Sequence, residues 1–154
     1  MIKIFFQTGH EMLVDAPNLT ALDFKSKDMH RALLEKVDLS FSDFELANLR
    51  AALLTNSTLV KCNFNKANLI NASLELSLSS FSTFVESRLI GSRFDGADLK
   101  HCDFSGADVE FASFVGADLR GAKFNCNNID SANLDMCLWD EETEFPIGFK
   151  LRTT

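Results

Sequence analysis

Residues 97–121 decide the fold, and they read Ala97-Asp-Leu-Lys-His-Cys-Asp-Phe-Ser-Gly-Ala-Asp-Val-Glu-Phe-Ala-Ser-Phe-Val-Gly-Ala-Asp-Leu-Arg-Gly121. This stretch repeats itself every five residues, and the same frame runs over residues 22–141 as 24 pentads without an insertion or deletion. The central residue is apolar in 23 of the 24 pentads, with Ser79 as the exception. A period of five fits neither a helix near 3.6 nor a strand near 2, so the chain must turn once in every pentad.

The position two residues before each centre is almost always small. Between residues 32 and 137 it holds Ala, Ser or Cys in 20 of 22 pentads, and Val37 and Asn127 are the departures. If each pentad is a short extended side followed by a corner, the centre and this small residue point inward and the other three point outward. We therefore predict a narrow core in which volume is scarce.

A spacing of twenty residues indicates how many sides make one coil. Six residues at this spacing are all phenylalanine: Phe24, Phe44, Phe64, Phe84, Phe104 and Phe124. Twenty residues are four pentads, so a coil has four sides and the phenylalanines stack along one of them. This stacking explains why the chain has 15 Phe and no Tyr, because a tyrosine hydroxyl in such a core would lack a hydrogen-bond partner.

The pattern resembles the pentapeptide-repeat family, whose consensus is A(D/N)Lxx. Five pentads match it directly, beginning at Ala47, Ala67, Ala97, Ala117 and Ala132. The resemblance covers about three quarters of the chain. It implies an all-β fold, a right-handed quadrilateral β-helix with about six coils of four pentads.

The repeat divides the chain into an N-terminal cap (residues 1–21), the β-helix (22–141) and a C-terminal cap or tail (142–154). The ends of a solenoid expose strand edges and core, so we expect both to be covered. Phe145, Ile147 and Phe149 lie in a stretch that we do not expect to form another repeat. They are candidates either for a lid over the last coil or for an end-to-end homodimer interface, so the chain is a monomer or such a dimer.

Length, composition and charge exclude several classes of protein. The chain has 154 residues, enough for one domain, and a net charge of -7 that makes free nucleic acid a poor partner. We find no signal peptide and no apolar run long enough to cross a membrane, so we expect a cytoplasmic protein with reduced thiols.

No constellation of residues points to catalysis or to a cofactor. His10, His30 and His101 fall far apart in the repeat map, so neither a catalytic site nor a metal site is expected. Cys62 and Cys102 share an inward column and are interpreted as small core residues. Cys126 falls at an outward position, where its thiol is expected to be accessible.

The outward apolar residues are the candidates for a protein-binding surface: Phe41, Leu78, Phe81, Ile70, Ile90 and Phe111. Ile70 and Ile90 occupy one column on successive coils. Around Ser79 two interpretations are open. A local rotation or bulge could bring Leu78 inward, or Phe41, Leu78 and Phe81 could form an apolar patch with Lys61 between them.

These observations favour a non-enzymatic module that presents a rigid, scaffold-like surface to another protein. The alternative, implied by the resemblance, is a DNA-mimicking modulator of DNA gyrase or another type II topoisomerase. Such mimicry needs rows of carboxylates, whereas the map spreads the acids almost evenly over four sides. Asp98, Asp103, Asp108 and Asp118 precede repeat centres, where we expect them to bond to turn backbone.

Overall fold

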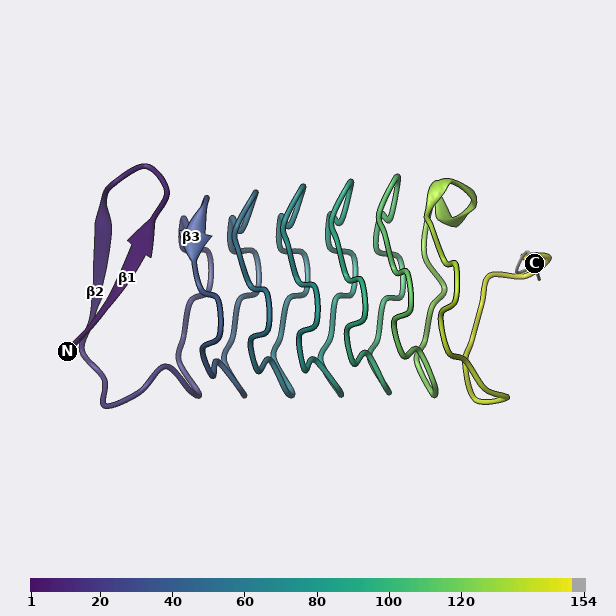
Figure 1. Cartoon of the computed structure of the whole chain (residues 1–154), viewed down its shortest axis with the longest axis horizontal. Coiled ribbons are helices and arrows are strands. Elements are labelled where there is room, and N and C mark those ends of the chain that lie inside the picture. The colour runs from purple at the N-terminus through teal and green to yellow at the C-terminus, as the bar shows by residue number, and fades with distance from the viewer. Residues whose placement is uncertain (151–154) are drawn as a thin grey trace.

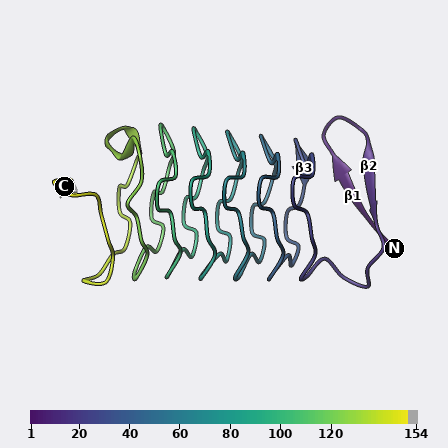
Figure 2. The same ribbon diagram turned by 180° about the vertical axis from the view of Figure 1, so that it is seen from behind.

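The computed structural model describes residues 1–150, which form a rod of stacked coils (Figure 1). An N-terminal hairpin lies at one end of the rod, and the C-terminal segment lies at the other end in both views (Figures 1 and 2). No helix in the described part of the chain has the length and apolar character needed to cross a membrane.

Parallel backbone bridges between residues twenty apart hold the coils together. Over residues 1–150 there are 21 isolated bridges, from Asp23↔Asp43 to Lys123↔Glu144, and 19 of them have an offset of twenty. Each side contributes one bridge, so four sides make one turn of the solenoid. The predicted period of five and the four-sided coil are confirmed by this pairing.

Inward positions form a continuous core. The repeat centres from Phe24 to Phe124 are buried, and so are the small residues two places before them. The predicted phenylalanine column stacks ring on ring from Phe24 to Phe104, with centroids 4.7–5.0 Å apart and interplanar angles of 3–14°. Phe124 breaks the stack by turning its ring 67° from that of Phe104.

Each corner is a four-residue turn whose third residue has a positive φ. The turn that begins at Phe44 is typical: Ala47 N–H donates to Phe44 O at 2.9 Å, and the third residue, Leu46, has a φ of 60°. Every fifth residue from Ala21 to Gly121 has such a φ, and most of these residues are not glycine. Type II turns require a positive φ at this position. The turn geometry is therefore imposed by the coil, even where the side chain disfavours it.

The N-terminal cap is a β-hairpin joined to the first coil. Strand β1 (Ile2–Phe6) pairs antiparallel with β2 (Glu11–Val14) on one edge and with β3 (Ala32–Leu33) on the other, in the sheet order β2-β1-β3. Ile4 and Phe6 are buried in the core, while Met12 and Val14 pack against it from β2.

The frame slips by one residue near Cys126, which corrects the expectation that this thiol is accessible. Asp108 bridges Asn127 rather than residue 128, an offset of nineteen, and Cys126 N–H donates to Phe124 O in a turn shortened by one residue. Cys126 thereby takes the small inward position that Asn127 would have filled, and it is buried. The chain makes up the missing residue at Asn128 and at the 3₁₀ helix η1 (Ile129–Ser131), after which the frame resumes.

Burial also controls the cysteine chemistry. It raises the pKa of Cys62 to about 12, and it raises the pKa values of Cys102 and Cys126 far above the ordinary thiol value. Cys137 is only partly buried, and its pKa is raised by the same cause. None of the four sulfur atoms forms a disulfide within the described residues.

The C-terminal stretch continues the solenoid by one side, contrary to the expectation that no repeat could form there. Lys123 bridges Glu144 with an offset of 21, and the Thr143 hydroxyl donates to Leu119 O at 3.0 Å from the small inward position. Phe145 therefore lies one residue late in the phenylalanine column, 6.0 Å from the Phe124 ring centroid. The repeat tolerates this insertion because the extra residue lies in the connection and not in the paired side.

We predict that the stacked phenylalanines dominate stability. Phe64→Ala removes a fully buried ring and should lower the free energy of unfolding by about 3–5 kcal/mol. Phe111→Ala, the matched control at an exposed corner, should change it by less than about 0.5 kcal/mol. Urea unfolding followed by circular dichroism gives both values. Equal losses in the two variants would contradict the described core.

We also predict that Cys137 is the thiol that reacts first with Ellman's reagent in the native protein, because the other three are buried. Cys137→Ser should abolish the early reaction, and Cys126→Ser should leave it intact. The measurement is the time course of absorbance before and after addition of urea. Rapid native-state labelling of Cys126 would show that the frame does not slip where the structure places the slip.

Candidate protein-binding surface

One corner of the rod carries aromatic and cationic side chains on four successive coils. These residues are twenty apart in sequence, and we refer to them together as the corner ridge: Phe41, Lys61, Phe81 and His101. Each occupies the third position of a corner turn and has a φ between 56° and 65°. Side chains at this position point away from the core, so the solenoid itself aligns the four groups.

The ridge residues contact one another in pairs. The Lys61 ammonium nitrogen lies 5.9 Å from the Phe41 ring centroid, within the range of a cation–π contact. The Phe81 and His101 rings stack with centroids 4.9 Å apart and an interplanar angle of 19°. Phe41 is nevertheless 59% exposed and Phe81 53% exposed, so the contacts orient the rings without burying them.

Gly121 continues this corner beyond His101 and has a steric reason to be glycine. A Cβ atom at this position would lie 2.3 Å from His101 Nδ1, closer than any real contact, and the φ of 68° also disfavours a side chain. The absent side chain leaves room for the imidazole beside Phe81. The ridge therefore ends at His101.

Leu78 extends the ridge onto the adjoining side of the rod. Its side chain is 51% exposed, and its backbone bridges Thr58 and Asp98 with the regular offset of twenty. Of the two interpretations open at Ser79, the rotation that would bring Leu78 inward is wrong, and Leu78 is exposed together with Phe41 and Phe81. Ser79 stays inside, where its hydroxyl lies 2.8 Å from the Ser77 hydroxyl in a buried hydrogen bond.

The other three apolar candidates do not join this patch. Ile70 and Ile90 are partly buried at the second position of another corner, and Phe111 is exposed at the third position of that same corner. Two sides of the rod separate that corner from the ridge in either direction, so the two corners are diagonally opposite. The six candidates thus form two surfaces, of which the ridge with Leu78 is the larger exposed aromatic one.

Aspartates before the repeat centres act on the local backbone, as predicted. Asp98, Asp103, Asp108 and Asp118 each accept a hydrogen bond from the backbone N–H two residues later, at 2.9–3.3 Å. The Arg120 guanidinium lies 2.6 Å from the Asp118 carboxylate and lowers the pKa of that carboxyl. Each of these carboxylates thus stabilises its own turn through at least one of its oxygens.

Further ion pairs between or within coils neutralise much of the remaining side surface. They join Lys25 to Asp43 and Glu45, Lys66 to Glu86, Arg93 to Glu75 and Asp95, Lys100 to Asp98 and Asp118, and Lys123 to Asp103. Lys61 of the ridge takes part in no ion pair among residues 1–150. The sides therefore show alternating charge and no continuous anionic stripe.

Charge is uneven along the rod axis, although it is even around it. Residues 1–66 contain eight acidic and eight basic residues, whereas residues 124–154 contain six acidic residues and only two basic ones, Lys150 and Arg152. The C-terminal end therefore carries most of the negative charge. A sum of the charges on each of the four sides does not reveal this gradient, whereas a sum for each successive coil does.

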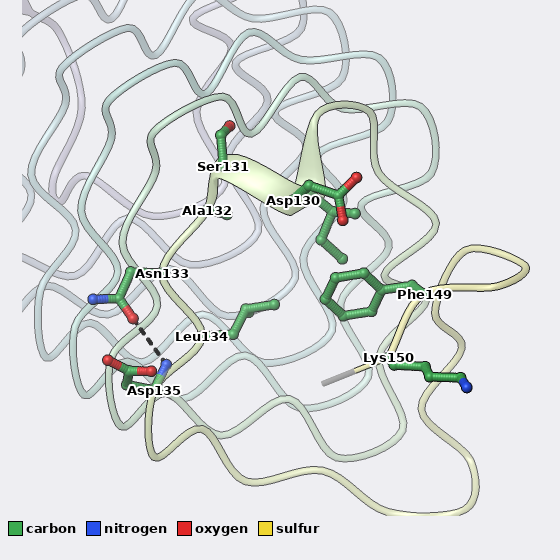
Figure 3. Close-up of a pocket in the computed structure, with 9 residues that line it drawn as sticks. Asp130, Ser131, Ala132, Asn133, Leu134, Asp135, Phe149 and Lys150 are labelled. Carbon is green, nitrogen blue, oxygen red and sulfur yellow. Dashed lines mark hydrogen bonds between the residues drawn. The ribbon is translucent and has the colours of Figure 1, made fainter. Parts of the chain in front are cut away.

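At the acidic end, the three candidate cap residues differ in their surroundings. Phe145 and Phe149 pack against the core with ring centroids 5.7 Å apart, while Ile147 is fully exposed. Phe149 faces Leu134 across a cavity of about 370 Å³ that Asp130, Asp135 and Lys150 also line (Figure 3). Within residues 1–150 no group of three or more His, Cys, Asp or Glu side chains is arranged to hold a metal ion.

A second apolar surface, which was not predicted, lies on the N-terminal sheet. Phe5 of β1 and Leu33 of β3 are paired in register, and both are exposed together with Leu13 of β2. The available signal was that Leu33 and Leu53 stand immediately before repeat centres, where the repeat usually has Asp or Asn. A departure from the consensus at that outward position indicates a surface with a different role.

Two family profiles match the chain. One, described as "Pentapeptide repeat region", matches residues 57–134, and the other, "Pentapeptide repeats (8 copies)", matches residues 18–50. A comparison with curated proteins finds no match.

Several solved structures are similar to this chain. A pentapeptide repeat protein from the Arabidopsis thaliana thylakoid lumen is 22% identical with a TM-score of 0.45, over 62% of this chain and just under two thirds (66%) of its own length. Rfr23 from the cyanobacterium Cyanothece 51142 is 21% identical with a TM-score of 0.36, over 83% of this chain and 87% of its own. Full-length QnrB1, a plasmid-mediated fluoroquinolone resistance protein, is 13% identical with a TM-score of 0.33, over 82% of this chain and 74% of its own length. Similarity at this level identifies no partner.

Proposed function

Because the chain belongs to the pentapeptide-repeat family, whose fold is the right-handed quadrilateral β-helix, we propose that it is a non-enzymatic module that binds another protein. The binding surface in this proposal is the corner ridge together with Leu78. The coils fix its geometry, so little conformational entropy is lost when a partner binds.

The observation that supports the proposal is the presence of exposed phenylalanines on left-handed corners. Phe41 and Phe81 have φ values of 65° and 63°, where an L-residue costs roughly 1–2 kcal/mol and glycine does not. Glycine occupies five of the seven positive-φ corner positions from Gly91 to Gly121, so the fold accepts glycine there readily. The exposed rings gain no core burial to offset this cost. Large apolar side chains that stay exposed and do not enter the core of their own chain are typical of binding surfaces.

Charge defines the chemistry of the expected partner. Lys61 lies between the two phenylalanines in the ridge and has its ammonium group free of ion pairs within residues 1–150. A partner with apolar side chains on either side of a carboxylate would match this order of groups. Successive coils are about 4.8 Å apart, which sets the spacing that such a partner must meet.

Modulation of DNA gyrase or another type II topoisomerase by DNA mimicry is the second candidate function. The observation in its favour is the acidic C-terminal end, with six carboxylates over residues 124–149. Against it stand the ion pairs that neutralise carboxylates along the sides, where a mimic of a DNA backbone would need them free. We therefore place the protein-binding role first.

We predict that Phe81→Asp weakens partner binding at least tenfold. The partner is first captured in the source cells by a photo-cross-linking amino acid at position 81, and its affinity for the purified variants is then measured by calorimetry. Phe111→Asp, with the same change on the diagonally opposite corner, is the control and should bind within about twofold of the unmodified chain. Unchanged affinity for Phe81→Asp would remove the ridge from the binding surface.

We also predict that the protein leaves DNA supercoiling by purified bacterial gyrase unchanged at micromolar concentration, with and without a quinolone. The reason is that paired carboxylates along the sides cannot replace a row of phosphates. The assay compares supercoiled and relaxed plasmid on agarose gels. Inhibition of gyrase, or relief of quinolone inhibition, would favour the second candidate over the first.

A further inference from the structure

The N-terminal end of the rod is an open sheet edge. β2 is the outermost strand in the order β2-β1-β3, and Figure 1 shows it at the extreme end of the molecule. Phe6 N–H donates to His10 O at 3.2 Å, so these two residues form a hydrogen-bonded pair. Hydrogen-bonded and non-hydrogen-bonded pairs alternate along an antiparallel ladder, so the next hydrogen-bonded pairs are Ile4 with Met12 and Ile2 with Val14. The backbone groups of Met12 and Val14 therefore face β1, and those of Glu11 and Leu13 face outward.

These outward groups have the chemistry of a strand-pairing site. No described residue outside the hairpin forms a backbone hydrogen bond with Glu11 or Leu13. Beside this edge the outer surface of the sheet carries three exposed apolar side chains, because Phe5 is 53% and Leu13 56% exposed and Leu33 adjoins Phe5, together with an exposed Lys3–Glu11 ion pair at 2.9 Å. An exposed edge flanked by apolar side chains pairs readily with another strand, and proteins usually block such edges.

The sequence of β2 is complementary to itself in one antiparallel register. With a two-fold axis at Met12, Glu11 lies opposite Leu13 of the second copy, and both pairs can exchange backbone hydrogen bonds. An axis at Leu13 would instead oppose Glu11 to Asp15, and an axis at Glu11 would oppose two glutamates. Like charges directly opposite each other are destabilising, so the register centred on Met12 is favoured.

The axial charge gradient selects the end at which two copies can meet. Residues 1–66 are balanced, with eight acids and eight bases, whereas residues 124–154 carry six acids and two bases, Lys150 and Arg152, and therefore a net charge of -4. Contact between two C-terminal ends would bring together two ends that each carry a net charge of -4. Contact between two N-terminal ends places these acidic ends at opposite tips of the assembly, which minimises their repulsion.

We propose that two copies of this chain pair through their β2 strands in the register centred on Met12. Their three-stranded sheets form one six-stranded sheet, and the rods lie end to end with the acidic ends outermost. This association does not depend on the proposed function, because the corner ridge lies elsewhere on the rod. It differs from the C-terminal interface expected from Phe145, Ile147 and Phe149.

Molar mass in solution tests the proposal, since the chain is 17.2 kDa and the dimer is twice that mass. Light scattering after gel filtration should give the dimer for the unmodified chain at about 50 µM, a concentration at which a dimer with micromolar Kd is mostly formed. Leu13→Lys should give the monomer, because it places a charge on the edge. Leu46→Lys, the control with the same 56% exposure on a remote corner, should remain a dimer. A monomeric unmodified chain, or a dimeric Leu13→Lys variant, would overturn the proposal.

Oxidative cross-linking tests the register independently of any folding defect in the lysine variant. Across the axis, the Cα atoms of residue 12 form a non-hydrogen-bonded pair about 4.5 Å apart, within disulfide range. Those of residue 13 are diagonal neighbours about 7–8 Å apart, beyond it. Met12→Cys should therefore yield a covalent dimer on a non-reducing gel, and Leu13→Cys should not. Cross-linking of Leu13→Cys alone, or of neither variant, would exclude this pairing.

Discussion

The structure depends on backbone hydrogen bonds between residues twenty apart. Each side of the rod is too short to be a stable strand alone, so its N–H and C=O groups must pair with the coils before and after it. The pairing fixes a four-sided coil and requires a turn with positive φ at every corner from Ala21 to Gly121. Core packing, corner conformations and the alignment of surface columns all follow from this one constraint.

One consequence is that each of the five positions of the repeat has its own structural role. The two inward positions are restricted by volume, and the position before the centre stabilises the turn through Asp or Asn side chains, as at Asp98 and Asp118. The two remaining positions contact mainly solvent and neighbouring coils. A surface such as the corner ridge can therefore change while the core stays the same, which is how one scaffold supports different partners.

The same periodic pairing makes the two ends unlike the middle. In the middle every coil is covered by the next one, whereas at each end the exposed core and strand edge are covered only by the adjacent terminal segment. At the N-terminus a hairpin covers the core through Ile4 and Phe6 but leaves the outer edge of β2 without a partner strand among residues 1–150. At the C-terminus Phe145 extends the core by one side, and the last part of the chain carries six acidic residues. Electrostatic repulsion and strand pairing thus act at different ends.

The sequence by itself determined the period, the four sides, the inward columns and the exposed candidates Phe41 and Phe81, because each follows from a spacing that repeats without interruption. Only the tertiary structure decided that Cys126 is inward, that Phe145 rejoins the phenylalanine column, and that Leu78 stays outside beside the ridge. At the insertion and the deletion the chain keeps its backbone pairing with the adjacent coil, and at the polar centre the Ser79 hydroxyl bonds to the Ser77 hydroxyl of its own coil. Such compensation depends on which residues lie next to each other in space, and a count along the chain cannot detect it.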